Sequence, residues 1–369
     1  MVQSAFGSFS SVFCFASNLN SLWLMADPIQ VEGDQLTREM LQSYAIAKAF
    51  KLDKVLTCLD FDSSGELCLV TCEDELRMYD CLSGVHKKTS YSKKYGCEIA
   101  KFTHRKQNIL YSSTKEDDAI RYLSFHDNKF LRYFVGHTSR VTAIEMCPQD
   151  DQFMSASLDG EVRLWDLKSG QCTGILKTDS HNPRIAFDPQ GMIFAVSTNS
   201  SAIRLFDIKK LSEGPFATFS VPTDLMSGAG AAAGAWTTLK FSNDGKWLLL
   251  GNRDGALVAI DSFDCKVLWQ FSGRPCGAYK GPVDMDAVIT PDGNFVLGGS
   301  DDGIVHVWDA PPVIADAPVP TQPTILKSVA QLRGSKGDPC SLIKFNPRYS
   351  MFASANDKTL CFWLPSSDA

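Results

Sequence analysis

A short segment of the chain contains a histidine, two serines, an aspartate and a tryptophan that could act together. His137 precedes an apolar stretch in which Ser155, Ser157, Asp159 and Trp165 follow. A histidine near a carboxylate could perform acid–base chemistry or bind a metal. The same groups could instead form a buried hydrogen-bonded network, in which turn amides and the imidazole satisfy the carboxylate. We favour a structural network of His137, Ser157, Asp159 and Trp165, with Ser155 as the alternative hydroxyl.

A second group of candidate residues is cationic. Residues 84–144 carry 12 lysines and arginines against five acidic residues, a local charge of +7 in a chain whose net charge is −6. Such a region could bind an acidic or phosphorylated peptide, because each phosphoserine adds about −1.5 to −2 charges. Lys93, Lys94 and Arg121 are the candidate phosphopeptide contacts, and a solvated basic face without a ligand is the alternative. An acidic chain lacks the broad basic footprint of nucleic-acid binding.

Recognised catalytic motifs do not occur in the sequence. It has no phosphate-binding loop, nucleophile elbow, zinc-protease motif or dinucleotide-binding fingerprint, and it contains only six histidines. Cys68 and Cys72 have a spacing compatible with metal binding, but no second cysteine pair or histidine lies close in sequence, which favours buried thiols. The twelve cysteines lack the spacing of a disulfide framework and indicate an intracellular protein. We expect no enzymatic activity, cofactor or metal.

The elements that would position these residues form a repeat. An apolar strand, an Asx/Gly turn, a second apolar strand and an aromatic-Asp pair recur along the chain. The clearest copies are Ser155–Asp166 (SASLDGEVRLWD), Gly298–Asp309 (GGSDDGIVHVWD), Val196–Asp207 (VSTNSSAIRLFD), Val70–Asp80 (VTCEDELRMYD) and Leu250–Asp261 (LGNRDGALVAID). Strand-based self-similarity at a period of roughly 40 to 50 residues predicts a β-propeller whose blades each hold four antiparallel strands.

Seven units can be counted along the chain. They close at Asp80, Ser124, Asp166, Asp207, Asp261, Asp309 and Leu364, and the second unit has lost its Trp-Asp pair. The last unit supplies only three strands, so we assign Ser43–Phe50, which alternates apolar and polar residues, as its outer strand. The sequence therefore predicts an all-β, seven-bladed WD-repeat propeller over residues 38–365, closed by an N-terminal strand, with a tail at 366–369.

Three further segments depart from the repeat. Residues 1–37 form a leader that we expect to be disordered, and residues 1–24 lack the features of a secretory signal and could be an upstream start-site artefact. No stretch is long and apolar enough for a membrane helix. Pro222–Ala235 and Pro311–Pro323 are interpreted as loop insertions, between the fourth and fifth and between the sixth and seventh units; partner-docking loops are the alternative.

Several runs resemble one particular WD-repeat family. They are Tyr91–Gly96 (YSKKYG), the degenerate unit Tyr111–His137, Gly214–Phe219 (GPFATF), Leu239–Lys246 (LKFSNDGK) and the terminal FWLP. The family is the small nuclear WD-repeat subunit of the COMPASS histone lysine methyltransferase complex, which also occurs in phosphatase 1/PNUTS or cleavage-and-polyadenylation assemblies. The similarity spans about residues 38–365. The network of a histidine, a strand serine, a turn aspartate and a tryptophan also resembles that of WD-repeat proteins in general.

This resemblance implies a non-catalytic scaffold in the nucleus. It would be a monomer within a hetero-complex, helping to recruit the methyltransferase to phosphorylated RNA polymerase II, with no direct contact to nucleic acid or membrane. The alternative is a substrate receptor of a cullin ubiquitin ligase. Such receptors usually show Trp-Asp-x-Arg, whereas this chain has WDLK at Trp165–Lys168 and WDAP at Trp308–Pro311. A hydrolase or isomerase would need convergent polar groups in the central channel, which the motifs do not supply.

Overall fold

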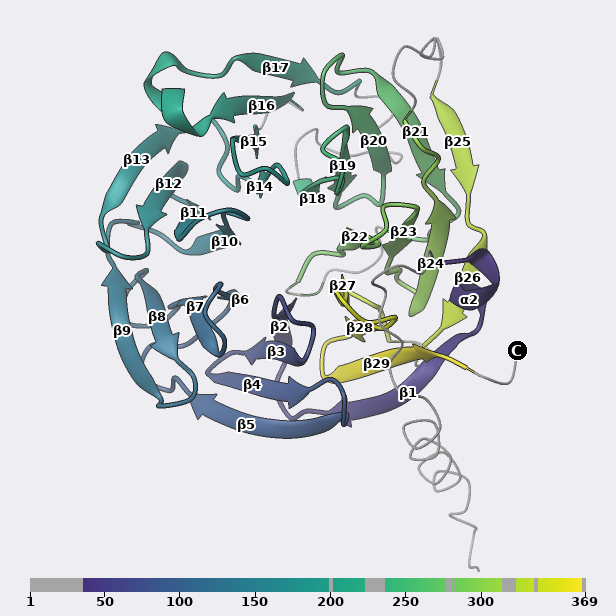
Figure 1. The fold of residues 1–369 in the computed structure, drawn as a ribbon, viewed down its shortest axis with the longest axis horizontal. Helices are drawn as coiled ribbons and strands as arrows, with labels where there is room; N and C mark the ends of the chain where they lie inside the picture. Colours follow the sequence, from purple (N-terminus) through teal and green to yellow (C-terminus); the bar gives the residue numbers. More distant parts are fainter. Residues whose placement is uncertain are drawn as a thin grey trace, which may run out of the picture.

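The computed structural model describes residues 36–198, 202–222, 236–276, 281, 283–313, 323–334 and 338–366. In this part of the chain, seven sheets are arranged radially around a central axis (Figure 1). The predicted all-β, seven-bladed propeller is confirmed.

Blades 1 to 4 follow one another along the chain, each with four antiparallel strands. From the axis outward, blade 1 consists of β2 (Leu56–Phe61), β3 (Leu67–Cys72), β4 (Glu75–Asp80) and β5 (Val85–Tyr91). Blade 2 consists of β6 (Ala100–Phe102), β7 (Asn108–Ser112), β8 (Ile120–Ser124) and β9 (Lys129–Phe134). Blade 3 consists of β10 (Val141–Met146), β11 (Gln152–Ser157), β12 (Glu161–Asp166) and β13 (Cys172–Lys177). Blade 4 consists of β14 (Ile185–Phe187), β15 (Ile193–Ser197), β16 (Ala202–Asp207) and β17 (Ala217–Ser220), with the 3-10 helix η1 (Ile208–Glu213) before β17.

The last three blades are less regular. Blade 5 consists of β18 (Trp236–Phe241), β19 (Trp247–Asn252), β20 (Leu257–Asp261) and β21 (Val267–Ser272). Blade 6 consists of β22 (Ala287–Ile289), β23 (Phe295–Gly298), β24 (Ile304–Asp309) and β26 (Ala330–Arg333). Blade 7 consists of β27 (Leu342–Phe345), β28 (Phe352–Ala355) and β29 (Thr359–Pro365), and its outer strand is β1 (Tyr44–Lys51).

The ring is closed by the two ends of the propeller. Strand β1 pairs antiparallel with β29, as the alternation of Ser43–Phe50 predicted, with Ala45 opposite Leu364. Gly65 in the β2–β3 turn has φ 72° and lies so close to the Asn346 side chain that a Cβ atom would collide with it. Because only glycine adopts this conformation cheaply and leaves that space, Gly65 lets blades 1 and 7 approach closely.

The hydrophobic core lies between neighbouring blades. One cluster joins buried side chains of blades 1 and 7, another joins blades 1 and 2, and a third joins blades 2 and 3. Because each sheet buries both faces against its neighbours, the second strands such as β3 and β19 are buried along their whole length, whereas the outer strands β5, β9 and β13 are largely exposed or alternate. The propeller is therefore one continuous packed ring, with polar residues at its loops and rim.

The Pro-rich segment differs from its predicted position. It lies within blade 6, between β24 and β26, and not between the sixth and seventh units. From Pro323 the chain continues into β25 (Thr324–Lys327), which pairs parallel with β21 and becomes a fifth strand of blade 5. Residues 314–322 lie outside the described residues, as do residues 223–235 of the other insertion.

The predicted leader and tail lie mostly outside the described residues, which begin at Leu36 and end at Ser366. Leu36 is buried in the core between blades 6 and 7. Thr37 caps the short helix α2 (Arg38–Gln42) by accepting the Met40 N–H at 3.2 Å. The described structure thus includes Leu36 and Thr37, which precede residue 38. No helix among the described residues could span a membrane.

Candidate protein-interaction site

The polar network of blade 3 is continuous and buried. The Trp165 Nε1–H donates to Ser155 Oγ at 2.8 Å, and Ser155 Oγ lies 2.7 Å from His137 Nε2. His137 Nδ1 lies 2.9 Å from Asp159 Oδ2. These distances fit a neutral imidazole whose Nδ1–H donates to the carboxylate and whose Nε2 accepts the serine proton.

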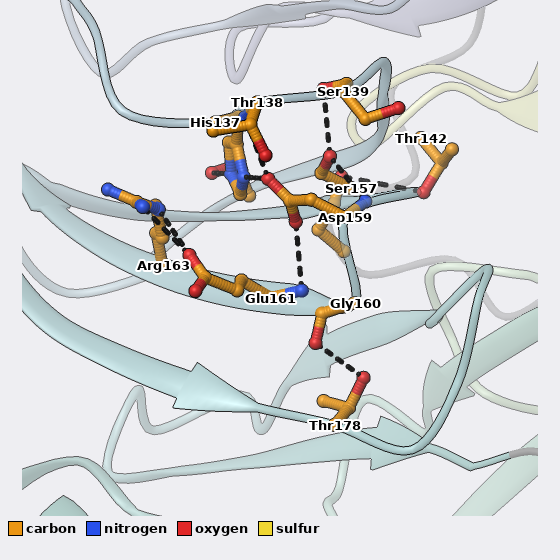
Figure 2. A network of polar contacts seen from close by, with 12 residues as sticks. His137, Thr138, Ser139, Thr142, Ser157, Asp159, Gly160, Glu161, Arg163 and Thr178 are labelled. Carbon is orange, nitrogen blue, oxygen red and sulfur yellow. Dashed lines mark hydrogen bonds and ion pairs between the residues drawn. The ribbon is translucent and has the colours of Figure 1, made fainter.

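The aspartate in this network is stabilised as a carboxylate by hydrogen bonds. Its oxygens accept the backbone N–H groups of Thr138 at 3.0 Å and Glu161 at 2.9 Å (Figure 2). Burial would raise the pKa of Asp159, but these amides and His137 hold it below its ordinary value. Burial lowers the pKa of His137 more than Asp159 raises it, so the imidazole is neutral near pH 7.

The predicted serine was the wrong one of the pair. Ser155, and not Ser157, lies between His137 and Trp165. The Ser157 hydroxyl donates to the Ser139 carbonyl at 2.8 Å and accepts the Asp159 N–H at 3.2 Å, so it braces the turn that holds the aspartate (Figure 2). The His137 side chain is 1% exposed, which leaves no access for a substrate. The network can position a loop and a tryptophan, but it offers no reacting group to solvent.

Blade 2 places different residues at the corresponding register positions. Arg121 lies opposite Tyr111 in β7–β8, as Arg163 lies opposite Ser155 in β11–β12. Leu123 takes the place of Trp165, since each pairs with the second residue of the preceding strand. With a tyrosine in place of the serine and a leucine in place of the tryptophan, the hydrogen-bonded chain of blade 3 cannot form.

Arg121 does not have the exposure expected of a phosphopeptide contact. Its side chain is 3% exposed, and its two Nη atoms donate to Asp117 at 2.8 and 2.9 Å. The guanidinium carbon lies 3.7 Å from the centroid of the Tyr95 ring and 5.7 Å from that of Tyr133. The prediction for Arg121 is corrected for this reason: counting charges along a sequence cannot tell a buried, paired guanidinium from a solvated one.

Lys93 and Lys94 do lie at the surface, and both contact aromatic rings. Lys93 Nζ is 5.5 Å from the Tyr91 ring centroid and Lys94 Nζ is 5.1 Å from that of Tyr95. Phe130 packs edge-on against Tyr95 at 6.3 Å and lies 5.6 Å from Tyr133. We call this group the aromatic-basic patch; its members are Tyr91, Lys93, Lys94, Tyr95, Arg121, Phe130 and Tyr133.

The patch has the composition of a protein-binding surface. Tyr91 and Tyr133 are 62% and 53% exposed although both are large apolar rings. Exposed aromatic residues are enriched where proteins bind one another. The patch is formed by the end of β5, the β5–β6 loop, β8 and β9, so it joins blades 1 and 2. The local charge in the sequence identified the lysines of the patch. The degenerate repeat pattern gave no signal that its tyrosines are exposed, so they were missed.

The central channel contains polar groups that the motifs did not indicate. A cavity of about 340 Å³ is lined mainly by inner-strand residues, including Lys101, Glu145, Lys240 and Asp286. Lys101 contacts Glu145 at 3.0 Å and Lys240 contacts Asp286 at 2.7 Å. The expectation that convergent polar groups are lacking is therefore wrong. These charges pair with one another, however, and no histidine is among the described residues that line the cavity.

The pKa values of the two channel lysines are shifted in opposite directions, although burial acts to lower both. Burial would lower the pKa of Lys101, but Glu145 and Asp60 hold it above its ordinary value. For Lys240, burial outweighs the attraction of Asp286 and its pKa is lowered. Both lysines form ion pairs, so neither offers a free nucleophile.

The described cysteines show no sign of a metal centre. All described cysteines are free thiols, and the described residues contain no cluster of His, Cys, Asp or Glu that could hold a metal ion. Cys68 and Cys72 are both fully buried in β3, and burial raises the pKa of both thiols, that of Cys72 to about 11. The two thiols are inert core residues at neutral pH.

Comparison with known proteins gives the family. The WD domain, G-beta repeat, family matches residues 128–166 and 273–309. WD repeat-containing protein 82 of Drosophila melanogaster is 39% identical over 338 residues, which cover 90% of this chain and 98% of that protein. The chain belongs to this family of WD-repeat proteins.

Two further relatives agree with this assignment and with the resemblance seen in the sequence. COMPASS component SWD2 of Saccharomyces cerevisiae is 35% identical over 313 residues, covering 84% of this chain and 90% of that protein. Set1 complex component swd2 of Schizosaccharomyces pombe is 33% identical over 337 residues, covering 84% and 92% respectively. This member of the family therefore matches its relatives along nearly the whole propeller, and its buried polar network and paired channel charges suit a scaffold-type subunit.

Proposed function

We propose that the chain is a scaffold subunit of a nuclear histone lysine methyltransferase complex of the COMPASS type, and that it helps to recruit this complex to phosphorylated RNA polymerase II. The observation that carries the proposal is the match, over 84% of the chain, to relatives named COMPASS component SWD2 and Set1 complex component swd2. A closed ring whose channel charges are paired with one another supports a role in positioning other proteins.

The aromatic-basic patch supports a contact with the phosphorylated polymerase tail. Lys93 and Lys94 are exposed, and the lysine ammonium groups can pair with phosphate as point charges. Tyr91 and Tyr95 provide flat apolar surface beside each charge. Arg121 contributes indirectly in this proposal, because it holds Tyr95 in place from below.

Membership of a complex is tested by affinity purification of the tagged full-length chain from nuclear extract. We expect methyltransferase subunits to co-elute in stoichiometric amounts. Co-elution of phosphatase 1/PNUTS or polyadenylation factors would assign the chain to those assemblies instead. Co-elution of cullin subunits alone would reject the proposal.

The phosphopeptide contact is tested with charge reversals. Binding of a phosphorylated polymerase-tail peptide to the Lys93→Glu/Lys94→Glu variant should weaken by roughly tenfold or more, about 1.4 kcal/mol. The matched control is Lys209→Glu/Lys210→Glu, which reverses another exposed lysine pair on η1 of blade 4. If both variants bind as the parent does, or if both lose affinity equally, the lysines of the patch are not the phosphate contact.

A further inference from the structure

The outer strand of blade 2 is unusually exposed for a propeller rim. Of the six residues of β9, five are exposed and only Phe134 is buried. Phe130, Leu131 and Tyr133 are 41%, 45% and 53% exposed. An edge strand presents unpaired backbone N–H and C=O groups, and proteins normally protect such edges with charges, short strands or covering segments. On β9 the charged residues Lys129 and Arg132 alternate with three exposed apolar side chains, so the edge is only partly protected.

A β-bulge like those in blades 1, 3 and 5 sets which side chains of this strand share a face. Arg121 lies opposite Tyr133 and Leu123 lies opposite Phe130, with a register shift between Tyr122 and Leu123. Because one extra residue is inserted, Phe130 and Tyr133 point to the same face of the sheet and their rings lie 5.6 Å apart. Leu131 is the extra residue. The edge therefore carries an aromatic pair on one face and a leucine displaced from the regular pairing.

Blade 5 shows what an additional strand on this propeller looks like. There β25 pairs with the outer strand β21 over four residue pairs, from Trp269 opposite Thr324 to Ser272 opposite Lys327 (Figure 1). A segment from a distant part of the chain thus covers an outer edge through backbone pairing. In blade 6, helix α2 packs against β26. Among the described residues, no strand pairs with the outer edge of β9.

The charges around this edge indicate the chemistry of a partner. Lys129 and Arg132 are exposed on β9 itself, and Lys93 and Lys94 lie in the neighbouring loop. Arg132 donates to the backbone carbonyl of Ser169 at 3.4 Å and not to a carboxylate. A segment that lies along β9 would therefore meet several cations together with exposed rings. Acidic side chains alternating with apolar ones would complement both.

We propose that β9 receives an extended acidic segment of a partner protein as a fifth strand of blade 2. Backbone hydrogen bonds to the open edge provide affinity, the aromatic pair accommodates alternate apolar side chains, and Lys129 and Arg132 select acidic ones. This contact shares Phe130 and Tyr133 with the aromatic-basic patch, but its selecting charges are Lys129 and Arg132, and it does not depend on membership of a methyltransferase complex.

The test selects linear peptides from a random display library on the full-length chain. We expect the enriched peptides to alternate acidic and apolar residues. Their affinity for Lys129→Glu/Arg132→Glu should fall by roughly tenfold or more. The matched control is Lys177→Glu, a charge reversal on β13, the outer strand of the next blade. Unchanged thermal unfolding of each variant shows that the fold is intact.

Backbone pairing has a signature that a simple charge contact lacks. N-methylation of alternate residues removes every second N–H of the peptide, and in an added strand only one of the two alternating sets faces β9. One set of N-methylated peptides should therefore lose binding and the other should retain it. Amide hydrogen exchange in β9 should slow when the unmodified peptide is bound.

Other results would overturn the proposal. They are failure to enrich any peptide, equal loss with both N-methylated sets, and equal loss with the β13 control. If light scattering shows that the parent is a dimer and the β9 variant a monomer, the β9 edge is occupied by a second copy of the chain. A chain that binds peptide only after removal of residues 1–35 is covered by its own leader. Both outcomes contradict a partner-protein segment.

Discussion

Blades 2 and 3 are neighbours with the same strand order, yet they use equivalent positions for opposite purposes. In blade 3, Trp165 is buried and joined through Ser155 to His137. In blade 2, a leucine replaces the tryptophan and a tyrosine replaces the serine, and a buried arginine stacks on the half-buried Tyr95 and lies near the exposed Tyr133. In blade 3 the polar groups form a hydrogen-bonded network in the core. In blade 2 they lie beneath the aromatic-basic patch.

The difference indicates that blade 2, which has lost the Trp-Asp pair, uses the equivalent positions for a different set of contacts. Asp117 and Asp159 both occupy the turn between the second and third strands of their blades. Asp159 is bonded to an imidazole and two backbone amides, whereas Asp117 accepts both Nη groups of Arg121. A blade can therefore keep its turn carboxylate while changing its donor. The cationic donor brings aromatic rings with it, since guanidinium groups stack on tyrosine.

The largest expected effect separates the two blades by stability. Trp165→Ala should lower the free energy of unfolding by about 3 to 5 kcal/mol, because it removes a fully buried indole and leaves a cavity. Tyr133→Ala, at the exposed rim of blade 2, should cost about 0.5 to 1 kcal/mol. Urea unfolding monitored by circular dichroism measures both. Similar losses in the two variants would mean that the rim of blade 2 is part of the core.

The next prediction tests which serine hydroxyl, that of Ser155 or that of Ser157, is hydrogen-bonded to His137 in the blade 3 network. His137→Ala should cost about 1 to 3 kcal/mol because Asp159 loses a donor. A double-mutant cycle of His137→Ala with Ser155→Ala should give a coupling energy of about 0.5 to 3 kcal/mol. The same cycle with Ser157→Ala should give a smaller coupling, since the Ser157 hydroxyl bonds backbone groups. Stronger coupling to Ser157 than to Ser155 would contradict the hydrogen-bond order described above.

A smaller effect is expected for the arginine of blade 2. Arg121→Met should lower the free energy of unfolding by about 1 to 2 kcal/mol, because Asp117 loses its partner and Tyr95 its stacked cation. Asp117 is nearly half exposed, so water compensates part of the loss. Arg121→Lys keeps the charge but not the paired geometry and should fall between Arg121→Met and the parent. If Arg121→Met unfolds like the parent but no longer binds phosphopeptide, Arg121 is a direct contact after all.

The sequence predicted the features that depend on periodicity. The repeat predicted the blades, and the strand deficit of the last unit predicted the pairing of β1 with β29. His137, Asp159 and Trp165 could also be predicted, because they lie close together in the sequence. The choice between Ser155 and Ser157 could not, because residues two apart on a strand point to the same face and only their three-dimensional neighbours distinguish them.

Other features depend on contacts that have no local signal. Strand β25 pairs with β21, more than fifty residues earlier in the chain, and only four residue pairs join them. The burial of Arg121 depends on Tyr95 and Asp117, which come from two different loops. The channel ion pairs join strands of different blades, such as Lys240 and Asp286. The composition gives the number of charged residues, but it does not show which of them form ion pairs.

The last prediction extends the comparison to a buried histidine without partners. His306 in β24 is 2% exposed and stacks on Trp308 with ring centroids 5.8 Å apart. Neither of its ring nitrogens has a hydrogen-bond partner among the described residues, unlike those of His137. Burial lowers the pKa of His306 from its ordinary value of 6.5. The fold therefore favours the neutral imidazole, although the described residues provide no hydrogen bond to either ring nitrogen.

The sign of the pH dependence follows from this lowered pKa. The unfolded chain takes up a proton at His306 near pH 6.5, whereas the native chain does so only at lower pH, so protons favour unfolding as the pH falls below about 6.5. His306→Phe keeps a ring on Trp308 and removes the titrating group. We expect the free energy of unfolding of this variant to fall less than that of the parent between pH 7 and pH 5. His137 titrates in both proteins, so the difference between their urea-unfolding curves reports His306. If the free energy of unfolding changes with pH equally in the parent and in His306→Phe, the His306 nitrogens have hydrogen-bond partners in solution.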